Sequence, residues 1–80
     1  MYIVYILRSE KDSKRYIGVT SDLKERLFEH RHGLVKSTKN RRPLRLIHTE
    51  EFETKSEALK REKFFKSGQG RKYLKEILKI

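Results

Sequence analysis

Residues 2–20 read YIVYILRSEKDSKRYIGVT, and this stretch decides the fold. Two apolar runs flank a polar bridge that extends from Ser9 to Arg15. Two apolar runs joined by a polar turn predict an antiparallel hairpin. Such a hairpin would set the phenol groups of Tyr5 and Tyr16 side by side on one small sheet. Gly18 follows in the second run, where a residue without Cβ lets another backbone or a phosphate come close.

The two tyrosines have two interpretations. They are good cross-strand partners in any amphipathic hairpin, so Tyr5 and Tyr16 can be structural residues and nothing more. A pair of phenol groups on one sheet can also belong to a site. The remaining residues of the chain decide between these interpretations.

Capping signals divide the rest of the chain into elements. Asp22 with Glu25, and Thr54 with Glu57, are capping-box pairs that begin two helices. Gly33 suits the position directly after a helix, where the backbone often adopts the left-handed conformation. The order strand-strand-helix-strand-helix-helix predicts an α+β fold, in which helices flank a three-stranded antiparallel sheet. The expected strands are residues 2–7, 16–20 and 44–49, and the expected helices end near Gly33, Gly68 and Lys79, the last beginning near Arg71.

The spacing of apolar residues predicts which side chains are buried. Strict alternation in the third strand places Leu46 with His48 on one face and Ile47 on the other. Helical spacing predicts that the second helix buries Ala58, Leu59 and Phe65, and the last helix Tyr73, Leu74, Ile77 and Leu78.

Composition limits the class of protein. The chain has 80 residues, of which 35% are apolar and 40% charged, so we expect one small domain (1–80) with a thin core. The absence of cysteine excludes disulfides and thiolate zinc sites and fits a reducing compartment. The first apolar run is too short for a signal peptide or a membrane span. We therefore expect a cytoplasmic protein, a monomer or weak dimer, with no membrane partner.

The positive charge is concentrated in the middle of the chain. The formal net charge is +10, and residues 31–49 carry six basic side chains and no acidic one. Such a segment is typical of a surface that binds a polyanion, although a solvated basic face is the alternative. An anionic membrane surface fits less well, because the segment contains Pro43 and lacks an amphipathic period. The residues predicted to contact nucleic acid are Gly18, Lys36, Ser37, Thr38, Lys39, Arg41 and Arg42.

Arg26 and His30 lie four residues apart on one face of the first predicted helix. Each has a structural interpretation: Arg26 can cover the core with its stem, and His30 can favour the helix dipole. Beside two tyrosines, however, a guanidinium and an imidazole suit phosphodiester chemistry, since a guanidinium can grip a phosphate and stabilise developing charge.

Glu62 falls within the predicted apolar stripe of the second helix, between Ala58 and Phe65. A buried glutamate needs a cation. The cation can be Arg26 or Arg61, or it can be a metal ion. A single carboxylate suits Mg²⁺ or Mn²⁺ when water and phosphate oxygens fill the other ligand positions.

The tripeptides Ile3-Val4-Tyr5 and Tyr16-Ile17-Gly18, followed by Arg26, His30 and Glu62, resemble the GIY-YIG nuclease family. The chain looks like the small stand-alone bacterial members. The resemblance implies a similar fold and makes Arg26 the phosphate-contacting arginine, His30 a second active-site residue and Glu62 the metal-binding glutamate.

The function expected from these residues is a metal-dependent endonuclease that hydrolyses phosphodiester bonds, in DNA rather than RNA. Tyr5, Tyr16, Arg26, His30 and Glu62 would gather around one divalent ion. A tyrosine, or a water that it orients, would begin the attack, and Tyr16 is favoured because its tripeptide is intact. A tyrosine titrates near 10, so Arg26 and the metal ion are expected to lower its pKa. Recognition should depend on the shape of the substrate rather than on its bases.

The alternative function is a non-catalytic module that binds nucleic acid through residues 31–49. The short chain favours it, and so does the missing downstream asparagine that many members carry, since Asn40 lies upstream of Glu62. Gln69 is a possible substitute for that asparagine. A second departure from the family is Ile3, which replaces a glycine. Strand breaks that depend on a divalent ion would distinguish the two functions.

Overall fold

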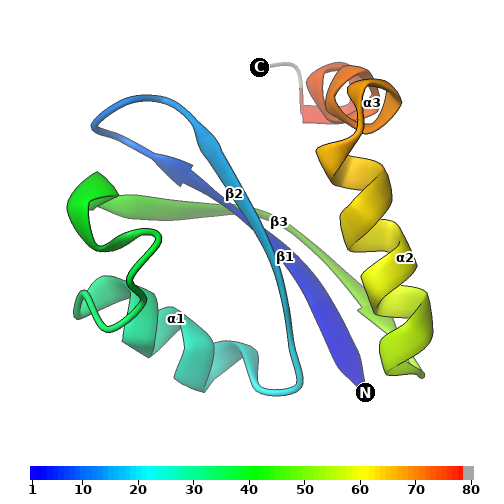
Figure 1. Cartoon of the computed structure of the whole chain (residues 1–80), viewed down its shortest axis with the longest axis horizontal. Helices are drawn as coiled ribbons and strands as arrows, with labels where there is room; N and C mark the ends of the chain where they lie inside the picture. The colour runs from blue at the N-terminus through cyan, green and yellow to red at the C-terminus, as the bar shows by residue number, and fades with distance from the viewer. Residues whose placement is uncertain (79–80) are drawn as a thin grey trace.

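The computed structural model describes residues 1–78, and these build one antiparallel sheet with helices on both of its faces (Figure 1). The strand order is β2-β1-β3, so the first strand is central and the second lies at an edge. A short 3₁₀ turn, η1, precedes the third strand. The α+β class and the predicted order of elements are confirmed. The elements are β1 (Tyr2–Ser9), β2 (Arg15–Thr20), α1 (Leu23–Arg31), η1 (Lys39–Arg41), β3 (Leu44–Phe52), α2 (Lys55–Lys66) and α3 (Gly68–Leu78).

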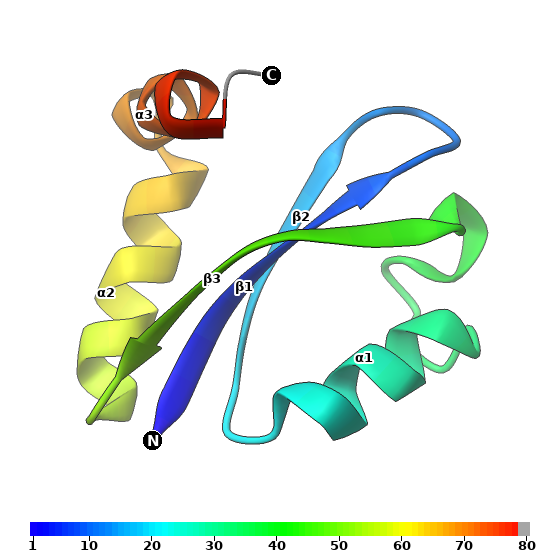
Figure 2. The same ribbon diagram turned by 180° about the vertical axis from the view of Figure 1, so that it is seen from behind.

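The central strand β1 separates the core from the face that carries the tyrosines. Side chains alternate along a strand, so Val4 and Ile6 point toward α2 and α3, and Tyr5 points toward α1. All residues from Val4 to Leu7 are buried, as expected for a strand covered on both faces. Figures 1 and 2 show α1 on one side of the twisted ribbon and α2 with α3 on the other.

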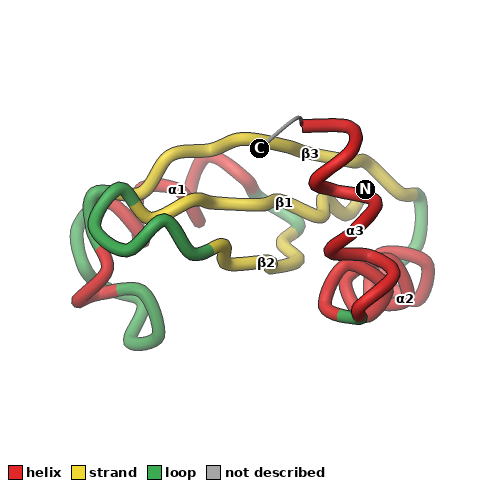
Figure 3. Tube along the Cα trace, turned by 90° about the horizontal axis from the view of Figure 1, so that it is seen from above, coloured by secondary structure: helices red, strands yellow, loops and turns green. Residues whose placement is uncertain are grey.

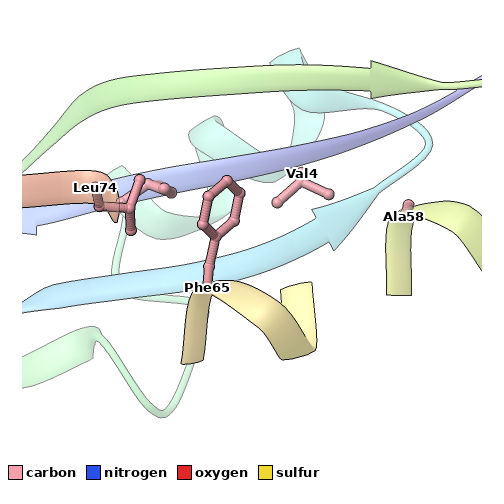
Figure 4. Packing of buried hydrophobic residues seen from close by; sticks show 5 residues of the cluster. Val4, Ala58, Phe65 and Leu74 are labelled. Carbon is pink, nitrogen blue, oxygen red and sulfur yellow. The ribbon is translucent and has the colours of Figure 1, made fainter. Parts of the chain in front are cut away.

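The apolar core lies between the sheet and the α2–α3 pair. In Figure 4, Ala58 and Phe65 project from α2 and Leu74 from α3, toward Val4 of β1. Each of these side chains is fully buried. Figure 3 shows the strands as one curved layer, with the α2–α3 pair and α1 at opposite ends of the view. The opposite face of the sheet, which faces α1, carries the polar groups of Tyr5 and its partners.

Local hydrogen bonds explain where the helices begin and end. The side chains of Asp22 and Thr54 accept hydrogen bonds from the backbone N–H groups three residues ahead, as the capping pattern predicts. Gly33 has a φ of 71° just beyond α1, which confirms its left-handed role. The second helix ends close to the predicted Gly68, with Ser67 as its cap, but the predicted start of the last helix near Arg71 is wrong, because the Ser67 hydroxyl accepts from the N–H of Gly70. The segment from Gly68 is thus the first turn of α3, and the predicted helix end at Lys79 lies outside the described residues.

A β-bulge changes the side-chain pattern of β3. Leu7 pairs with Leu46 and Ile6 with His48, so Ile47 is the extra residue between them. Ile47 packs against the core, and Leu46 is 39% exposed. The predicted alternation, with Leu46 on the same face as His48 and Ile47 opposite, is therefore wrong at this point.

Three further apolar side chains are less buried than their spacing predicts. Leu59, Tyr73 and Ile77 are all exposed, whereas Ala58, Phe65 and Leu74 are buried. The sheet is narrow, so α2 and α3 each contact it through only a few residues, and the apolar residues next to these on the helix face solvent. None of the helices in residues 1–78 combines the length and the apolar character that crossing a membrane requires.

Candidate active site

The hydroxyl of Tyr5 is the centre of a polar network between β1 and α1. It lies 2.9 Å from Nε2 of His30, and Nε of Arg26 donates to it over 3.3 Å. The ring of Tyr16 lies beside this group, with its centroid 6.2 Å from that of Tyr5 and 5.1 Å from that of His30. Four of the five residues predicted for the catalytic site therefore lie together.

The network continues from His30 to Thr38, and its hydrogen-bond directions follow from the donors available. Nδ1 of His30 lies 2.7 Å from Oγ1 of Thr38, which donates onward to the carbonyl of Val35. Arg26 has only donors, so the Tyr5 oxygen accepts from Arg26 and its own proton goes to Nε2 of His30. His30 then carries its proton on Nδ1 and donates to Thr38. The buried chain runs Arg26, Tyr5, His30, Thr38, with every member satisfied.

Burial sets the protonation states of this network. It raises the pKa of Tyr5 to about 12, and the hydrogen bond from Arg26 offsets this only in part. The pKa of His30 is lowered, first by burial and then by the positive charge of Arg26. The pKa of Arg26 is raised, chiefly by its hydrogen bond to Tyr5 and next by that to Glu29. At neutral pH, Tyr5 and His30 are both neutral and Arg26 is charged. Arg26 lowers the pKa of Tyr5 as expected, but burial outweighs this effect, so the expected net lowering of the tyrosine pKa is wrong for Tyr5.

A pocket of about 490 Å³ opens beside this network, along the edge strand β2. It lies between α1 and α2, so it brings residues that are far apart in the sequence to one surface. Arg26 reaches it with a side chain that is 35% exposed. The predicted residues that line it are Tyr5, Tyr16, Gly18, Arg26 and Glu62.

Gly18 makes room for the phenol of Tyr5. The two residues are cross-strand partners, and a Cβ on Gly18 would lie 2.5 Å from the Tyr5 hydroxyl oxygen. A side chain there would push the hydroxyl away from Arg26 and His30. The close neighbour of Gly18 is therefore the Tyr5 ring, where the sequence predicted another backbone or a phosphate.

Glu62 lies at the rim of the pocket rather than in the core. Its side chain is 23% exposed, and its carboxylate pairs with Lys66 at 3.4 Å, one turn further along α2. The predicted ion pair with Arg26 or Arg61 is not formed, because Arg26 pairs with Glu29 and Arg61 with Glu50. The prediction that Glu62 is buried in an apolar stripe is wrong, since α2 turns Ala58 and Phe65 toward the sheet and Glu62 toward the pocket.

The donor set of the pocket fits a hard divalent cation. No group of three or more His, Cys, Asp or Glu side chains within residues 1–78 is placed to hold a metal ion. Mg²⁺ keeps several waters and takes oxygen ligands, so one carboxylate in an open pocket suits it when a phosphate completes the shell. Within residues 1–78 the ion-pair partner of Glu62 is the exposed Lys66 at 3.4 Å, and such a pair is weak enough to exchange for an ion.

The basic segment is only partly available to a ligand. Thr38, predicted to contact nucleic acid, is fully buried against His30 and cannot reach one. The guanidinium of Arg41 pairs with Asp12 at 3.3 Å, and that of Arg42 donates to the carbonyls of Lys39 and Arg31. The remaining predicted residues, Lys36, Ser37 and Lys39, are exposed.

The roles of three residues of the site were not predicted from the sequence. Thr38 orients His30 from a loop eight residues away, and only the folding of that loop brings them together. Glu29 and Lys55 line the pocket from α1 and from the start of α2. The spacing of Glu29 from Arg26 could have indicated their pairing, since residues three apart on a helix are neighbours.

Comparison with known proteins places this geometry in a family. Residues 1–74 match the GIY-YIG catalytic domain. UPF0213 protein SSP2268 of Staphylococcus saprophyticus is 43% identical over 77 residues, which cover 95% of this chain and 93% of that protein. UPF0213 protein lwe0147 of Listeria welshimeri is 46% identical over 66 residues, which cover 81% of this chain and 72% of that protein.

A solved structure shares the fold. The solution NMR structure of UPF0213 protein BH0048 from Bacillus halodurans matches with a TM-score of 0.60 and 34% identity, over 96% of this chain and 85% of that chain. The match includes the strands and helices that form the pocket. The chain therefore belongs to the GIY-YIG nuclease family and is similar, over nearly its whole length, to the small bacterial UPF0213 proteins.

Proposed function

We propose that this protein is a divalent-ion-dependent endonuclease that hydrolyses phosphodiester bonds in DNA and selects its substrate by shape. The observation that carries the proposal is the Tyr5 hydroxyl, held between Arg26 and His30 in a pocket shared with Tyr16 and Glu62. A structural hairpin does not need a histidine, an arginine and a carboxylate at one edge. These groups together suit the hydrolysis of a phosphate ester.

The hydrogen bonds of the network assign different roles to the two tyrosines. The hydroxyl of Tyr5 already accepts from Arg26 and donates to His30, so Tyr5 is a positioning residue. Tyr16 is half-buried and lines the pocket, so its phenol is the one proposed to face the attacking water. The water oxygen would form a new bond to phosphorus while Tyr16, acting as a phenolate, takes one proton of that water. The bond to the leaving sugar oxygen would break, and that oxygen would take a proton from the solvent.

Arg26 would bind the phosphate that is attacked. Its Nε and one terminal nitrogen are held by Tyr5 and Glu29, which fixes the plane of the guanidinium. A guanidinium in a fixed plane is suited to a phosphate oxygen on which negative charge develops. When bound at Glu62, Mg²⁺ or Mn²⁺ would neutralise negative charge on the phosphate and on the leaving oxygen.

The choice of substrate rests on the shape of the site. The pocket is open and lies beside β2, the edge strand of a narrow sheet. Phosphate contacts carry no sequence information. We therefore propose that the protein acts at exposed or distorted strands, with no preferred base sequence.

A cleavage assay tests the proposal. Wild-type protein should nick branched, single-stranded or duplex DNA with Mg²⁺ or Mn²⁺ but not with a chelator, and RNA serves as a comparison. Tyr16→Phe should lower the rate by roughly 10²–10⁴, as expected for a lost general base. Tyr73→Phe on α3 removes a phenol oxygen outside the pocket and is the matched control. If Tyr16→Phe cuts as fast as wild type, the proposed base is wrong.

Glu62→Gln tests the metal-dependent part. Cleavage with Mn²⁺ should be lost, while the thermal unfolding midpoint should stay near that of wild type, because an exposed ion pair with Lys66 contributes little. Glu76→Gln, an exposed carboxylate on α3, is the control. A wild-type protein that binds DNA but cuts no substrate with either metal ion would instead be a non-catalytic binding module.

A further inference from the structure

We propose that a second cleft, between β2 and the junction of α2 with α3, holds the phosphates next to the one that is cut. The inference rests on the proposed function, because it extends the same DNA strand beyond the active-site pocket. The cleft has a volume of about 670 Å³ and lies on the other side of Tyr16. We call it the flanking cleft; its basic residues are Lys14, Arg15, Lys66 and Arg71.

The flanking cleft carries charge of one sign. Among the described residues, four basic side chains line it and no acidic one does, which is the pattern expected where a protein neutralises consecutive phosphates. Nη1 of Arg15 is buried and has no hydrogen-bond partner within the described residues. An unpaired buried donor on a charged group is costly, so a rearrangement of the guanidinium that lets it bind an anion is favoured. The cleft is thus lined by four basic side chains, and one of them carries an unpaired donor.

The flanking cleft adjoins the active-site pocket. Tyr16 lines both of them. Glu62 lines the pocket and Lys66 lines the cleft, and their side chains meet in an ion pair one helical turn apart. A strand whose scissile phosphate lies beside Tyr16 and Glu62 would therefore pass directly into the basic cleft.

The active-site pocket alone does not attract a polyanion strongly. Its charged lining consists of Arg26 and Lys55 against Glu29 and Glu62, two positive and two negative side chains. Such a balance suits the chemistry of one phosphate, but long-range attraction requires net positive charge nearby. The flanking cleft supplies it.

The hollow formed by the basic segment is less suited to this role. It has a volume of about 500 Å³, and none of the residues that line it also lines the active-site pocket. Two of its cationic groups are already bound to carbonyls: Nζ of Lys11 donates to Asn40, and the guanidinium of Arg42 donates to Lys39 and Arg31. The strand that is cut is therefore expected to follow the flanking cleft.

Binding of a fluorescent single-stranded DNA oligonucleotide, measured against salt in the presence of a chelator, tests the inference without cleavage. Lys14→Gln combined with Arg71→Gln removes two cleft charges and leaves the Glu62–Lys66 pair intact. The slope of log affinity against log salt should flatten by about 1.4, since each phosphate contact contributes about 0.7 on a single strand. The control, Lys72→Gln with Lys75→Gln, removes two exposed charges of α3 that line neither cavity, and its slope should match that of wild type.

A cleavage assay over a range of DNA concentrations separates this inference from the proposed function. The cleft double variant should need a higher DNA concentration than wild type to reach half of its maximal rate, whereas the α3 control variant should not. Equal salt slopes for the cleft and control variants would overturn the inference, even if wild-type protein cuts DNA. A flattened slope with a wild-type protein that never cuts would support the cleft and refute the endonuclease.

Discussion

Replacing Tyr5 by phenylalanine removes one buried oxygen and tests the whole network. The ring fits the same space beside Gly18, so the change is confined to hydrogen bonding. Nε2 of His30 loses its donor, and Arg26 loses an acceptor. A buried polar atom left without a partner costs about 1–3 kcal/mol. At neutral pH we therefore expect Tyr5→Phe to lower the free energy of unfolding by that amount.

The difference between the two proteins should shrink at alkaline pH. The pKa of Tyr5 is raised to about 12 in the folded state, against about 10 in the unfolded chain. A raised pKa contributes stability that is fully present below pH about 10 and is lost as the pH rises toward about 12, because only the unfolded chain releases its proton in that interval. Between pH about 9 and about 11, the advantage of wild type over Tyr5→Phe should fall by about 1.3 kcal/mol.

Urea unfolding of both proteins at several pH values measures this difference. All other titrating groups are shared, so they cancel when the unfolding free energies are subtracted. A difference that stays constant from neutral to alkaline pH would refute the argument that burial holds Tyr5 in its protonated form. No difference at neutral pH would refute the hydrogen-bond network itself.

Two further predictions concern stability. The pKa of His30 is lowered, mainly by burial and further by Arg26, so the unfolding free energy should fall as the pH drops below about 6.5. His30→Gln removes this titrating group, so its unfolding free energy should depend less on pH on the acid side. Gly70→Ala should destabilise the protein by about 1–3 kcal/mol or more in thermal melts, since a Cβ would lie 1.8 Å from the Phe64 carbonyl oxygen. Gly68→Ala is the control: a Cβ at Gly68 would have no atom within 4 Å, so this change should be neutral or stabilising.

The parts of the fold that were predictable depend on neighbours in the sequence. Helix starts at Asp22 and Thr54 use hydrogen bonds that span three residues. The hairpin follows from two apolar runs and the short bridge between them. Arg26 and His30 were predictable as a pair because four residues make about one helical turn. Arg26 and His30 contact Tyr5 because α1 packs on the face of the sheet that carries the tyrosines.

What could not be predicted depends on how the elements pack together. The alternation of apolar and polar residues in β3 does not indicate the bulge at Ile47, because the bulge arises from the pairing of β3 with β1. The rotation of α2 decides whether Leu59 and Glu62 face the sheet or the pocket, and helical spacing alone allows either. The bond from His30 to Thr38 depends on the path of a loop with no regular period.

The first helix is attached to the sheet in an unusual way. His30 is the only side chain of α1 that is fully buried, and it is polar. The helix that carries Arg26 is therefore fastened largely by hydrogen bonds to Tyr5 and Thr38, which water can replace. Such an attachment opens at a lower free energy than an apolar core does. We therefore expect α1, with Arg26, to separate from the sheet at a lower free energy than α2 and α3, which the apolar core holds.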